Sequence, residues 1–411
     1  MAEEQLPGLV DLTPVNPAFN DDPHKPLKTL RDKCPVYRDA NAGLFILTRY
    51  NDVRGVLSDT SMWRSPELAE ECSVLDQALR RQDESALPAD EQKKGILLMD
   101  EPDHMRIREP IAKALYKRVA KSKALLQQVI DEKLDAIDPT KPFDAMAEFA
   151  LLVPVDAIAR ILGVDNSRLK EFREWSEGVI LSLNTFRTEE ETAQLKRCGI
   201  ALSNYMRELM HARRKAPKDD LVSDIIAVQA QGANLTDGEI SATLQGLLVG
   251  GNLTTTDLIG NAILAFLKNP GELAKLKADP SLINSAVEEV LRYESPVDIT
   301  TRIAPREMEV GKCPVHPHQS MVMSLRGANR DPEAFENPDR FDISRKGPPH
   351  VAFGGGLHLC IGAPLARIEA QAAILSFFTR FPNVRLADPH AKLEWRTLPF
   401  FRGLKKLTVA A

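Results

Sequence analysis

The sequence lacks the features that define several large classes of protein. Its five cysteines are odd in number and scattered, with no Cys-x-x-Cys pair, so neither a disulfide framework nor a zinc site is indicated. The most apolar stretch, FALLVPVDAIARILGV, contains Pro154, Asp156 and Arg160, which argues against a transmembrane helix. The formal net charge of -5 gives no basis for nucleic-acid binding. The N-terminal stretch MAEEQLPGLVDLTPVN is acidic and interrupted by proline, unlike a signal peptide, so we expect a cytoplasmic protein without a membrane anchor.

No Ser/Gly-rich or Pro-rich linker and no repeat interrupts the 411 residues, so we expect one domain spanning residues 1–411. Hydrophobic residues at 43% and charged residues at 27% are typical of a globular protein with a sizeable core. Helical periodicity dominates residues 103–294, whereas β-like segments are short and few: LFILTRY, ITTRIA, SMVMSL and LKKLTVA. The predicted fold class is therefore mainly α, a large helical body with a small β-sheet region.

One predicted helix is long enough to be a central element. Thr236 and Glu239 form a capping-box pattern at its start, and apolar residues recur to Leu267 before Asn269-Pro270 ends the run. Such a helix of roughly 30 residues would be about 45 Å long. It contains GGNLTTTDL, residues 250–258, whose glycines and threonines are poor helix formers.

The segment DPEAFENPDRFDISRKGPPHV, residues 331–351, is too rich in proline and charge for regular structure. It nevertheless contains Phe335 and Phe341, which favour burial. We therefore expect an ordered, packed loop.

The strongest chemical motif is FGGGLHLCIGAPLAR, residues 353–367. Its three glycines permit backbone conformations barred to other residues and a close approach to a flat ligand. Cys360 follows just before a helical pattern that begins at Ala363, and a helix N-terminus favours the thiolate form, which binds metal. Without this context, a lone cysteine is usually a small buried hydrophobic residue.

Two nucleotide-binding motifs do not fit the glycine-rich stretches. A dinucleotide fingerprint that starts at Gly354 and Gly356 would need its third glycine where Leu359 stands, and no βαβ unit surrounds it. GGNLTTT lacks the Gly-Lys-Ser/Thr sequence of a P-loop.

The stretch from Phe353 to Arg367 resembles the haem-binding loop of the cytochrome P450 superfamily, F-G-x-G-x-H-x-C-x-G-x-x-L-A-R, at every specified position. EEVLR resembles the family's E-x-x-R pair and NRDPEAFENPDRFD its meander segment. MDEPDHMRIR and DDLVSDII are similar to helical segments of the bacterial, soluble type. The resemblance covers most of the chain and implies the cytochrome P450 fold, a triangular prism around a buried haem b (iron protoporphyrin IX).

The resemblance also assigns residues to the haem. It implies Cys360 as the iron ligand, with Phe353, Gly354 and Gly362 beside the cofactor. The two haem propionates form a largely buried dianion that needs neutralising donors. The donors implied by the resemblance, each of which could otherwise be a solvated surface residue, are His104, Arg108, Arg302 and His358.

Glu289 and Arg292 form the E-x-x-R pair, and the resemblance implies Arg340 as the third member of a structural triad that fixes the Cys360 loop. On an exposed helix, an i, i+3 pair of this kind would be worth only a few tenths of a kcal/mol. A buried pair needs complete hydrogen bonding, which a third partner could supply.

In the central helix, the resemblance places Gly250 and Gly251 beside the oxygen site and makes the Thr254 hydroxyl the proton relay. Threonine hydroxyls that bond back to carbonyls can loosen a helix and open a groove over the iron. The family usually has Asp or Glu immediately before this threonine, but Leu253 stands there. We therefore expect a water chain organised by Thr254 with help from Asn252.

A thiolate ligand favours cleavage of the O–O bond of dioxygen, so the resemblance implies a monooxygenase. It would insert one oxygen atom from O2 into a small or mid-sized hydrophobic substrate, by hydroxylation or O-dealkylation. Apolar residues implied to line the substrate pocket are Gly246, Val249, Gly250, Val297, Ile299 and Phe400. An arginine from residues 72–92 or 181–192 could meet a charged group on the ligand.

No flavin or iron–sulfur pattern lies in the chain, so we expect electrons from a ferredoxin with its reductase. A basic segment in this acidic protein predicts the docking surface, although lysine-rich helices are often simply solvated. Its members are Arg106, Arg108, Lys113, Lys117, Arg118, Lys121 and Lys123.

Two alternatives stay open at this point. The missing acid before Thr254 favours a peroxide-using or non-oxygenating haem-thiolate enzyme. The other alternative is a non-catalytic haem-binding or ligand-binding protein.

Overall fold

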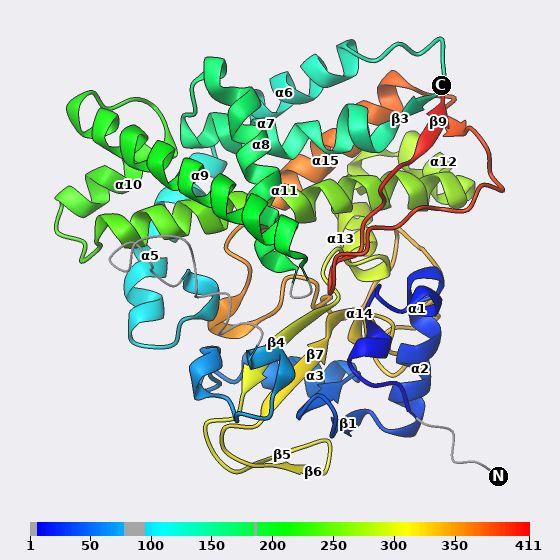
Figure 1. The fold of residues 1–411 in the computed structure, drawn as a ribbon. Helices are drawn as coiled ribbons and strands as arrows, with labels where there is room; N and C mark the ends of the chain where they lie inside the picture. The colour runs from blue at the N-terminus through cyan, green and yellow to red at the C-terminus, as the bar shows by residue number, and fades with distance from the viewer. Residues whose placement is uncertain (1–5, 78–94, 185–186) are drawn as a thin grey trace. The chain divides into compact units, whose positions relative to one another are not determined.

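A computed structural model describes residues 6–77, 95–184 and 187–411 (Figure 1). The chain forms two compact units. Unit 1 comprises residues 1–81, 261–360 and 394–405, and unit 2 comprises residues 82–260, 361–393 and 406–411. Each unit is therefore assembled from segments that are far apart in the sequence.

Unit 1 is built on a four-stranded sheet in the order β1-β2-β7-β4. The strands are β1 (Val36–Asp39), β2 (Leu44–Leu47), β7 (Ser320–Ser324) and β4 (Ile299–Ile303). β1 and β4 run antiparallel to their neighbours, whereas β2 and β7 are parallel, with Leu44 opposite Ser320. Three of the predicted β-like segments, LFILTRY, ITTRIA and SMVMSL, thus lie in one sheet, as expected for a small β region.

Short elements complete unit 1. A separate hairpin pairs β5 (Met308–Val310) with β6 (Cys313–Val315). The helices are α1 (Pro17–Asp21), α2 (His24–Lys33), α3 (Tyr50–Ser58), α12 (Pro270–Ala278), α13 (Ile283–Tyr293) and α14 (Leu325–Asn329). The single turns of 3-10 helix are η1 (Val10–Leu12), η2 (Pro66–Leu68), η7 (Pro280–Leu282) and η8 (Gly356–His358).

Unit 2 is mainly helical, with α8 packed on α9, α15 on α6, and α10 on α5 and α9. Its core includes Ile111, Phe172, Leu202 and Leu244, which are almost completely buried. A small sheet, β3-β9-β8, joins Phe143–Asp144, Thr408–Ala410 and Arg385–Leu386. The helices are α5 (Asp103–Val119), α6 (Lys123–Asp135), α7 (Leu152–Leu162), α8 (Leu169–Ile180), α9 (Glu189–Lys215), α10 (Leu221–Ala230), most of α11 (Asp237–Lys268) and α15 (Ala363–Arg380), with the single turns η3 (Ile96–Leu98), η4 (Met146–Ala150), η5 (Asn166–Arg168) and η6 (Leu181–Leu183).

The predicted central helix is α11, which has 32 residues. Its capping box is present: the Glu239 amide donates to Thr236 Oγ1 at 3.2 Å, and the Thr236 amide donates to the Glu239 carboxylate at 2.8 Å. The GGNLTTT stretch does not interrupt the helix. Within residues 6–77, 95–184 and 187–411, no helix combines the length and hydropathy that a membrane span requires.

The segment from residue 331 to residue 351 has no helix or strand, as predicted. Phe335 packs edge-on against Tyr50, and Phe341 packs edge-on against Phe266. Both phenylalanines are buried, so the segment is an ordered, packed loop.

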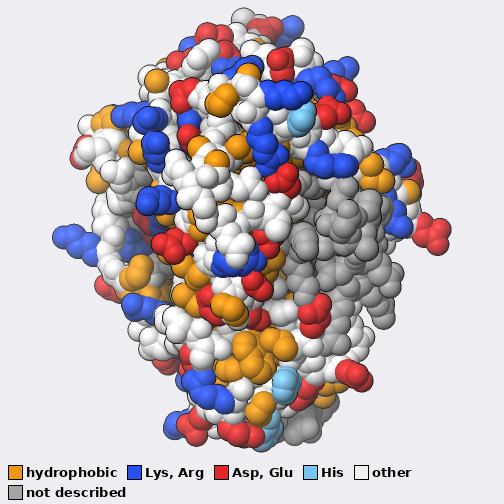
Figure 2. Space-filling model, turned by 90° about the vertical axis from the view of Figure 1, so that its left-hand side faces the viewer, with side chains coloured by type: hydrophobic (Ala, Val, Ile, Leu, Met, Phe, Trp, Pro, Cys, Tyr) orange, Lys and Arg blue, Asp and Glu red, His pale blue; other side chains and the backbone are white. Residues whose placement is uncertain are grey.

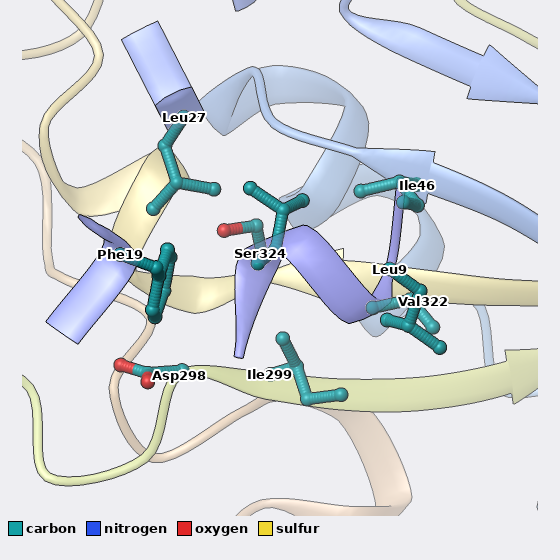
Figure 3. Close-up of a pocket in the computed structure, with 9 residues that line it drawn as sticks. Leu9, Phe19, Leu27, Ile46, Asp298, Ile299, Val322 and Ser324 are labelled. Carbon is teal, nitrogen blue, oxygen red and sulfur yellow. The ribbon is translucent and has the colours of Figure 1, made fainter. Parts of the chain in front are cut away.

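A small cavity lies between the N-terminal helices and the sheet of unit 1 (Figure 3). Its volume of about 10 Å³ is close to the space that one water molecule needs. Phe19, Leu27 and Ile46 are among the apolar side chains of its wall, and Asp298 borders it. The Asp298 carboxylate is held there by the guanidinium of Arg326 at 2.5 Å. The cavity is too small to admit a substrate.

Glu369 is an acid on the buried face of α15, in line with Leu365 and Phe377. Its Oε1 has no hydrogen-bond partner within the part of the chain that the structure describes. Burial raises the pKa of Glu369 to about 8, so this carboxyl group is mainly protonated at pH 7.

We predict that Glu369→Gln stabilises the protein at high pH. Because the folded-state pKa lies above the ordinary value, the folded protein retains a proton that the unfolded chain loses, and stability falls as the pH rises from about 4.5 to about 8. The glutamine stays neutral, so the variant should exceed the native protein by up to about 5 kcal/mol above that range. Urea unfolding at pH 5 and pH 9 measures this difference, with Glu109→Gln, an exposed position, as the control. Parallel pH profiles for the native protein and Glu369→Gln would contradict the prediction.

Candidate active site

In unit 1, the Cys360 loop depends on its glycines. Gly354 and Gly356 have φ angles of 70° and 63°, in the left-handed region that favours glycine. A Cβ at Gly356 would lie 2.3 Å from the carbonyl oxygen of Leu57, at the end of α3. The loop therefore packs against α3 more closely than any other residue type would allow.

Glu289 and Arg292 form a buried pair in α13, with two hydrogen bonds of 2.8 Å between the guanidinium and the carboxylate. We predicted Arg340 as the third member of the triad, but the structure has Arg345 there. The Nε atom of Arg345 lies 3.1 Å from both carboxylate oxygens of Glu289. Arg340 is exposed and contributes its backbone carbonyl, which accepts from Arg292 at 3.1 Å. The prediction was wrong because the meander turns the side chain of Arg345 inward.

Hydrogen bonds lead from this triad to Cys360. Arg292 Nη1 donates to the carbonyl of Asn329 at 2.9 Å, and Asn329 Oδ1 accepts from the Val351 amide at 2.8 Å. The Val351 carbonyl accepts from the Gly354 amide at 2.8 Å, and the neighbouring Phe353 carbonyl accepts from the Cys360 amide at 3.0 Å. Asn329 is completely buried. The helix α13 is thus linked through Asn329 to the start of the cysteine loop, and backbone hydrogen bonds within the loop hold Cys360.

Two of the predicted propionate partners also lie in unit 1. Arg302, on β4, is buried and donates to the carbonyls of Thr301 at 2.7 Å and Gly355 at 3.2 Å. His358 is half-buried in η8, within the loop itself. The structure therefore gathers Arg302, His358 and Cys360 around the same glycine loop.

The other two predicted propionate partners, His104 and Arg108, lie in unit 2, one turn apart on α5. His104 is buried, with Nδ1 3.5 Å from a carboxylate oxygen of Glu101. Burial lowers the pKa of His104, and the positive charge of Arg108 lowers it further. The imidazole is therefore mainly neutral at pH 7.

One face of α11 in unit 2 is open. Gly246, Gly250 and Thr254 follow one another at intervals of one turn; the glycines are exposed and Thr254 is half-buried. Among the residues that the structure describes, and apart from the backbone of α11 itself, a Cβ at Gly246, Gly250 or Gly251 would meet no atom within 4 Å. Thr254 Oγ1 donates to the Gly250 carbonyl at 2.6 Å, the back-bonding expected from the sequence. The glycines therefore leave space along the helix on the side where the threonine hydroxyl stands.

The neighbouring polar residues of α11 are on its buried side. Asn252 and Asp257 are almost completely buried, and so is Leu253. Asn252 is two residues from Thr254, about 200° around the helix, so their side chains leave it in nearly opposite directions. The structure thus separates Asn252 from Thr254.

The residues predicted to line a substrate pocket are distributed over both units. Gly246, Gly250 and Val249 belong to unit 2. In unit 1, Ile299 borders the small cavity of Figure 3, and Phe400 is buried in the same cluster below the N-terminal helices. Their contact with a substrate stays a prediction. Of the two ranges expected to supply an arginine, residues 78–94 and 185–186 lie outside the described part of the chain.

These features fit a haem group. Cys360 is a cysteine outside any disulfide, in a glycine loop that can approach a flat ligand, and Arg302 brings a buried cation to that loop. The open stripe of α11 leaves room for a ligand, with one hydroxyl beside it. A soft sulfur donor is also a suitable ligand for haem iron.

Comparisons with known proteins show which family the chain belongs to. The family model described as Cytochrome P450 matches residues 58–398. The chain belongs to the cytochrome P450 family. Cytochrome P450 107B1 of Saccharopolyspora erythraea is 36% identical over 408 residues, which cover 97% of each chain. Vitamin D(3) 25-hydroxylase of Pseudonocardia autotrophica is 32% identical, covering 95% of this chain and 94% of its own. The crystal structure of P450BioI in complex with a hexadec-9Z-enoic acid-ligated acyl carrier protein has a TM-score of 0.85 at 30% identity, with 96% and 100% coverage.

Membership establishes the chemical class. The protein has the cytochrome P450 fold, its cofactor is haem b, and it is a P450 monooxygenase. The family match extends through both units of the chain.

Three residues of this P450 were not found from the sequence. Arg345 and Asn329 support the cysteine loop, and Glu369 is a buried acid. Arg345 and Asn329 stand in or beside the irregular segment, where no periodicity identifies inward-pointing side chains. Glu369 has the i, i+4 spacing of the buried residues of α15, but an ionisable side chain is normally expected to be exposed, so the spacing alone did not identify it as buried.

We predict that Arg345→Ala, but not Arg340→Ala, weakens the haem loop. Arg345 is one of two arginines that bind Glu289, so its loss should cost about 1.5 to 3 kcal/mol, whereas an exposed arginine contributes little. Arg345→Ala should lower the free energy of unfolding and speed the transfer of haem to apomyoglobin. Equal haem loss from the two variants, or greater loss from Arg340→Ala, would refute the assignment of Arg345.

Proposed function

We propose that this P450 inserts one oxygen atom from O2 into a small or mid-sized hydrophobic substrate, by hydroxylation or O-dealkylation. The observation that carries the proposal is the support of the Cys360 loop by Glu289, Arg292 and Arg345, which reaches the loop through Asn329 and Val351. Such support would hold a thiolate in one position, as iron ligation needs. When bound, the haem supplies dioxygen binding and an oxidant strong enough to attack C–H bonds.

In this proposal, residues of both units act as one P450 domain that holds the haem. Cys360 would bind the iron, Phe353, Gly354 and Gly362 would lie against the cofactor, and four basic residues would face the propionates. These residues are His104, Arg108, Arg302 and His358. His104 would act as a hydrogen-bond donor in its neutral form, because burial lowers the pKa of its imidazole.

Thr254 is proposed as the proton relay. Its hydroxyl donates to the Gly250 carbonyl, and by rotation it could receive a proton from a water molecule and release its own proton toward the open side of α11. Gly250 and Gly251 would leave room for that ligand. With Leu253 in place of the usual acid, the protons must come from water. The side chain of Asn252 is on the buried side of α11, so we assign Thr254 the main role in proton delivery.

The substrate is proposed to be hydrophobic because the residues expected near it are apolar. Gly246, Val249 and Gly250 give an open, uncharged surface on α11, and Val297 adds an aliphatic side chain from unit 1. The vitamin D(3) hydroxylase and the lipid-bearing acyl carrier complex among the similar proteins support a hydrophobic ligand. Ile299 and Phe400 complete the proposed set, and their contact with a ligand would require movement of the surrounding core.

We propose a ferredoxin with its reductase as the electron donor, docking on the α5–α6 side of unit 2. The structure modifies the set of docking residues predicted from the sequence. Arg106 forms two hydrogen bonds with Glu239, and Arg118 is held by Asp219 and Asp224. The residues left exposed for a partner are Lys113, Lys117, Lys121 and Lys123. Because acidic and basic side chains are interspersed on the face in Figure 2, the steering should be local and weakened by salt.

The absence of an acid at Leu253 favours a second candidate, a P450 that uses peroxide. The two candidates differ in their oxidant: only a dioxygen-dependent enzyme consumes O2 and ferredoxin electrons in proportion to oxygenated product. Screening hydrophobic compounds for displacement of iron-bound water would first supply a substrate.

We predict that Thr254→Ala uncouples electron use from product formation. The variant lacks the hydroxyl that moves protons to the oxygen site, so O2 consumption should continue while product per electron falls roughly tenfold or more. Thr254→Ser keeps the hydroxyl and should retain most of the coupling. The assay measures O2, electrons and product with reduced ferredoxin, with Asn252→Ala in parallel. Unchanged coupling in both alanine variants would reject the relay, and product made from peroxide alone at the full rate would favour the second candidate.

A further inference from the structure

Two cysteines outside the haem loop converge on one backbone oxygen. Cys34 Sγ lies 3.5 Å from the carbonyl oxygen of Val36, and Cys313 Sγ lies 3.6 Å from the same oxygen. The two sulfurs are therefore within about 7 Å of each other, although the residues are far apart in the sequence. Both are free thiols and both are half-buried.

The backbone holds both cysteines in place. Cys34 follows the last residue of α2, and Pro35 separates it from β1; the Pro35 carbonyl accepts a hydrogen bond from the Thr48 amide at 3.0 Å. Cys313 begins β6, next to a hairpin turn in which Gly311 has a φ of 54°. A Cβ at Gly311 would lie 2.7 Å from Cγ2 of Val36, so the turn packs directly against β1. The approach of the thiols is thus a property of the main chain of unit 1.

We propose that Cys34 and Cys313 form a reversible disulfide when the protein meets hydrogen peroxide. A disulfide requires sulfurs about 2 Å apart and Cβ atoms about 4 Å apart. Rotation of both side chains away from the shared carbonyl brings the sulfurs together, and the hairpin can follow because its turn is a short surface element. The bond would fasten the end of α2 to β6.

The reaction balances with peroxide as the oxidant. One thiolate attacks a peroxide oxygen, which gives a sulfenic acid and, after protonation of the leaving group, one water molecule. The second thiolate attacks the sulfenic sulfur, and the hydroxyl group leaves as a second water molecule. In total, two thiols and one peroxide give one disulfide and two waters, with two electrons passing from sulfur to oxygen.

The surroundings of the thiols set the rate of the reaction. Burial raises the pKa of the Cys34 thiol, and the neighbouring Cys313 raises it further. Because the thiolate is the reacting form, the disulfide should form faster at pH 9 than at pH 7. Two other cysteines serve as comparisons, because the described structure shows no second thiol beside either. Cys72 is exposed and hydrogen-bonded to Glu70, and Cys198 is buried in unit 2.

The test treats the holoenzyme with a small excess of hydrogen peroxide at pH 7 and pH 9, while the haem absorbance is followed. Trypsin then releases residues 34–38 and 313–326, each of which begins with Cys-Pro-Val. The expected product is a disulfide-linked pair of these two peptides, with a mass equal to the sum of their masses less two hydrogen atoms. Reduction with dithiothreitol should separate the pair into the two peptides. The oxidised protein should also unfold at a higher temperature than the reduced protein, since the bond closes a very long loop.

Matched variants make the outcome decisive. Cys34→Ser and Cys313→Ser should abolish the joined peptide and leave the remaining cysteine as a sulfenic acid that dimedone traps. Cys72→Ser and Cys198→Ser should form the joined peptide as the native protein does. The proposal is overturned if no joined peptide forms at either pH, whether the two thiols stay reduced or oxidise separately.

Discussion

A cysteine that is to hold haem iron must be kept in one position by groups other than its own side chain. In this protein that constraint falls on the backbone of the loop before α15. Gly354 and Gly356 give the loop its course, and the carbonyl of Phe353 accepts the amide of Cys360. Behind the loop, Glu289 accepts from two arginines and so avoids the cost of a buried unpaired charge. The triad of Glu289, Arg292 and Arg345 thus supports the loop that carries Cys360, and the proposed haem site depends on this support.

The central helix meets a different requirement, because it must be stable and yet leave space on one side. Its capping box stabilises the start of the helix, while Gly246, Gly250 and Gly251 keep one face free of side chains. Each glycine in the interior of a helix makes the helix less stable than alanine would, by about 1 kcal/mol. The buried side of α11 offsets this loss through packing, and the open side remains available for ligands. The proposed binding of ligands along α11 would explain why poor helix formers stand within a long helix.

The sequence was informative wherever a local rule applies. The capping box and Asn269-Pro270 correctly predicted the ends of α11, three of the β-like segments predicted the four-stranded sheet, and the cysteine motif predicted the family. The error at Arg340 arose in the meander, where two arginines lie close in sequence and only tertiary packing decides which one meets Glu289. Ile299 shows a similar limit, since strand alternation does not tell whether a side chain faces a ligand or the N-terminal helices. Contacts between distant segments, such as Asn329 with Val351, have no local signal.

The most direct test of the central claim is the absorption spectrum of the reduced protein with carbon monoxide. If Cys360 is the iron ligand, the native protein should show the long-wavelength Soret band of a thiolate-ligated haem, and Cys360→Ala should lack it. Cys313→Ser, which changes a cysteine of the same unit outside the loop, should keep the band. A protein that stays colourless with haem supplied, or a Cys360→Ala variant with the native spectrum, would contradict the account.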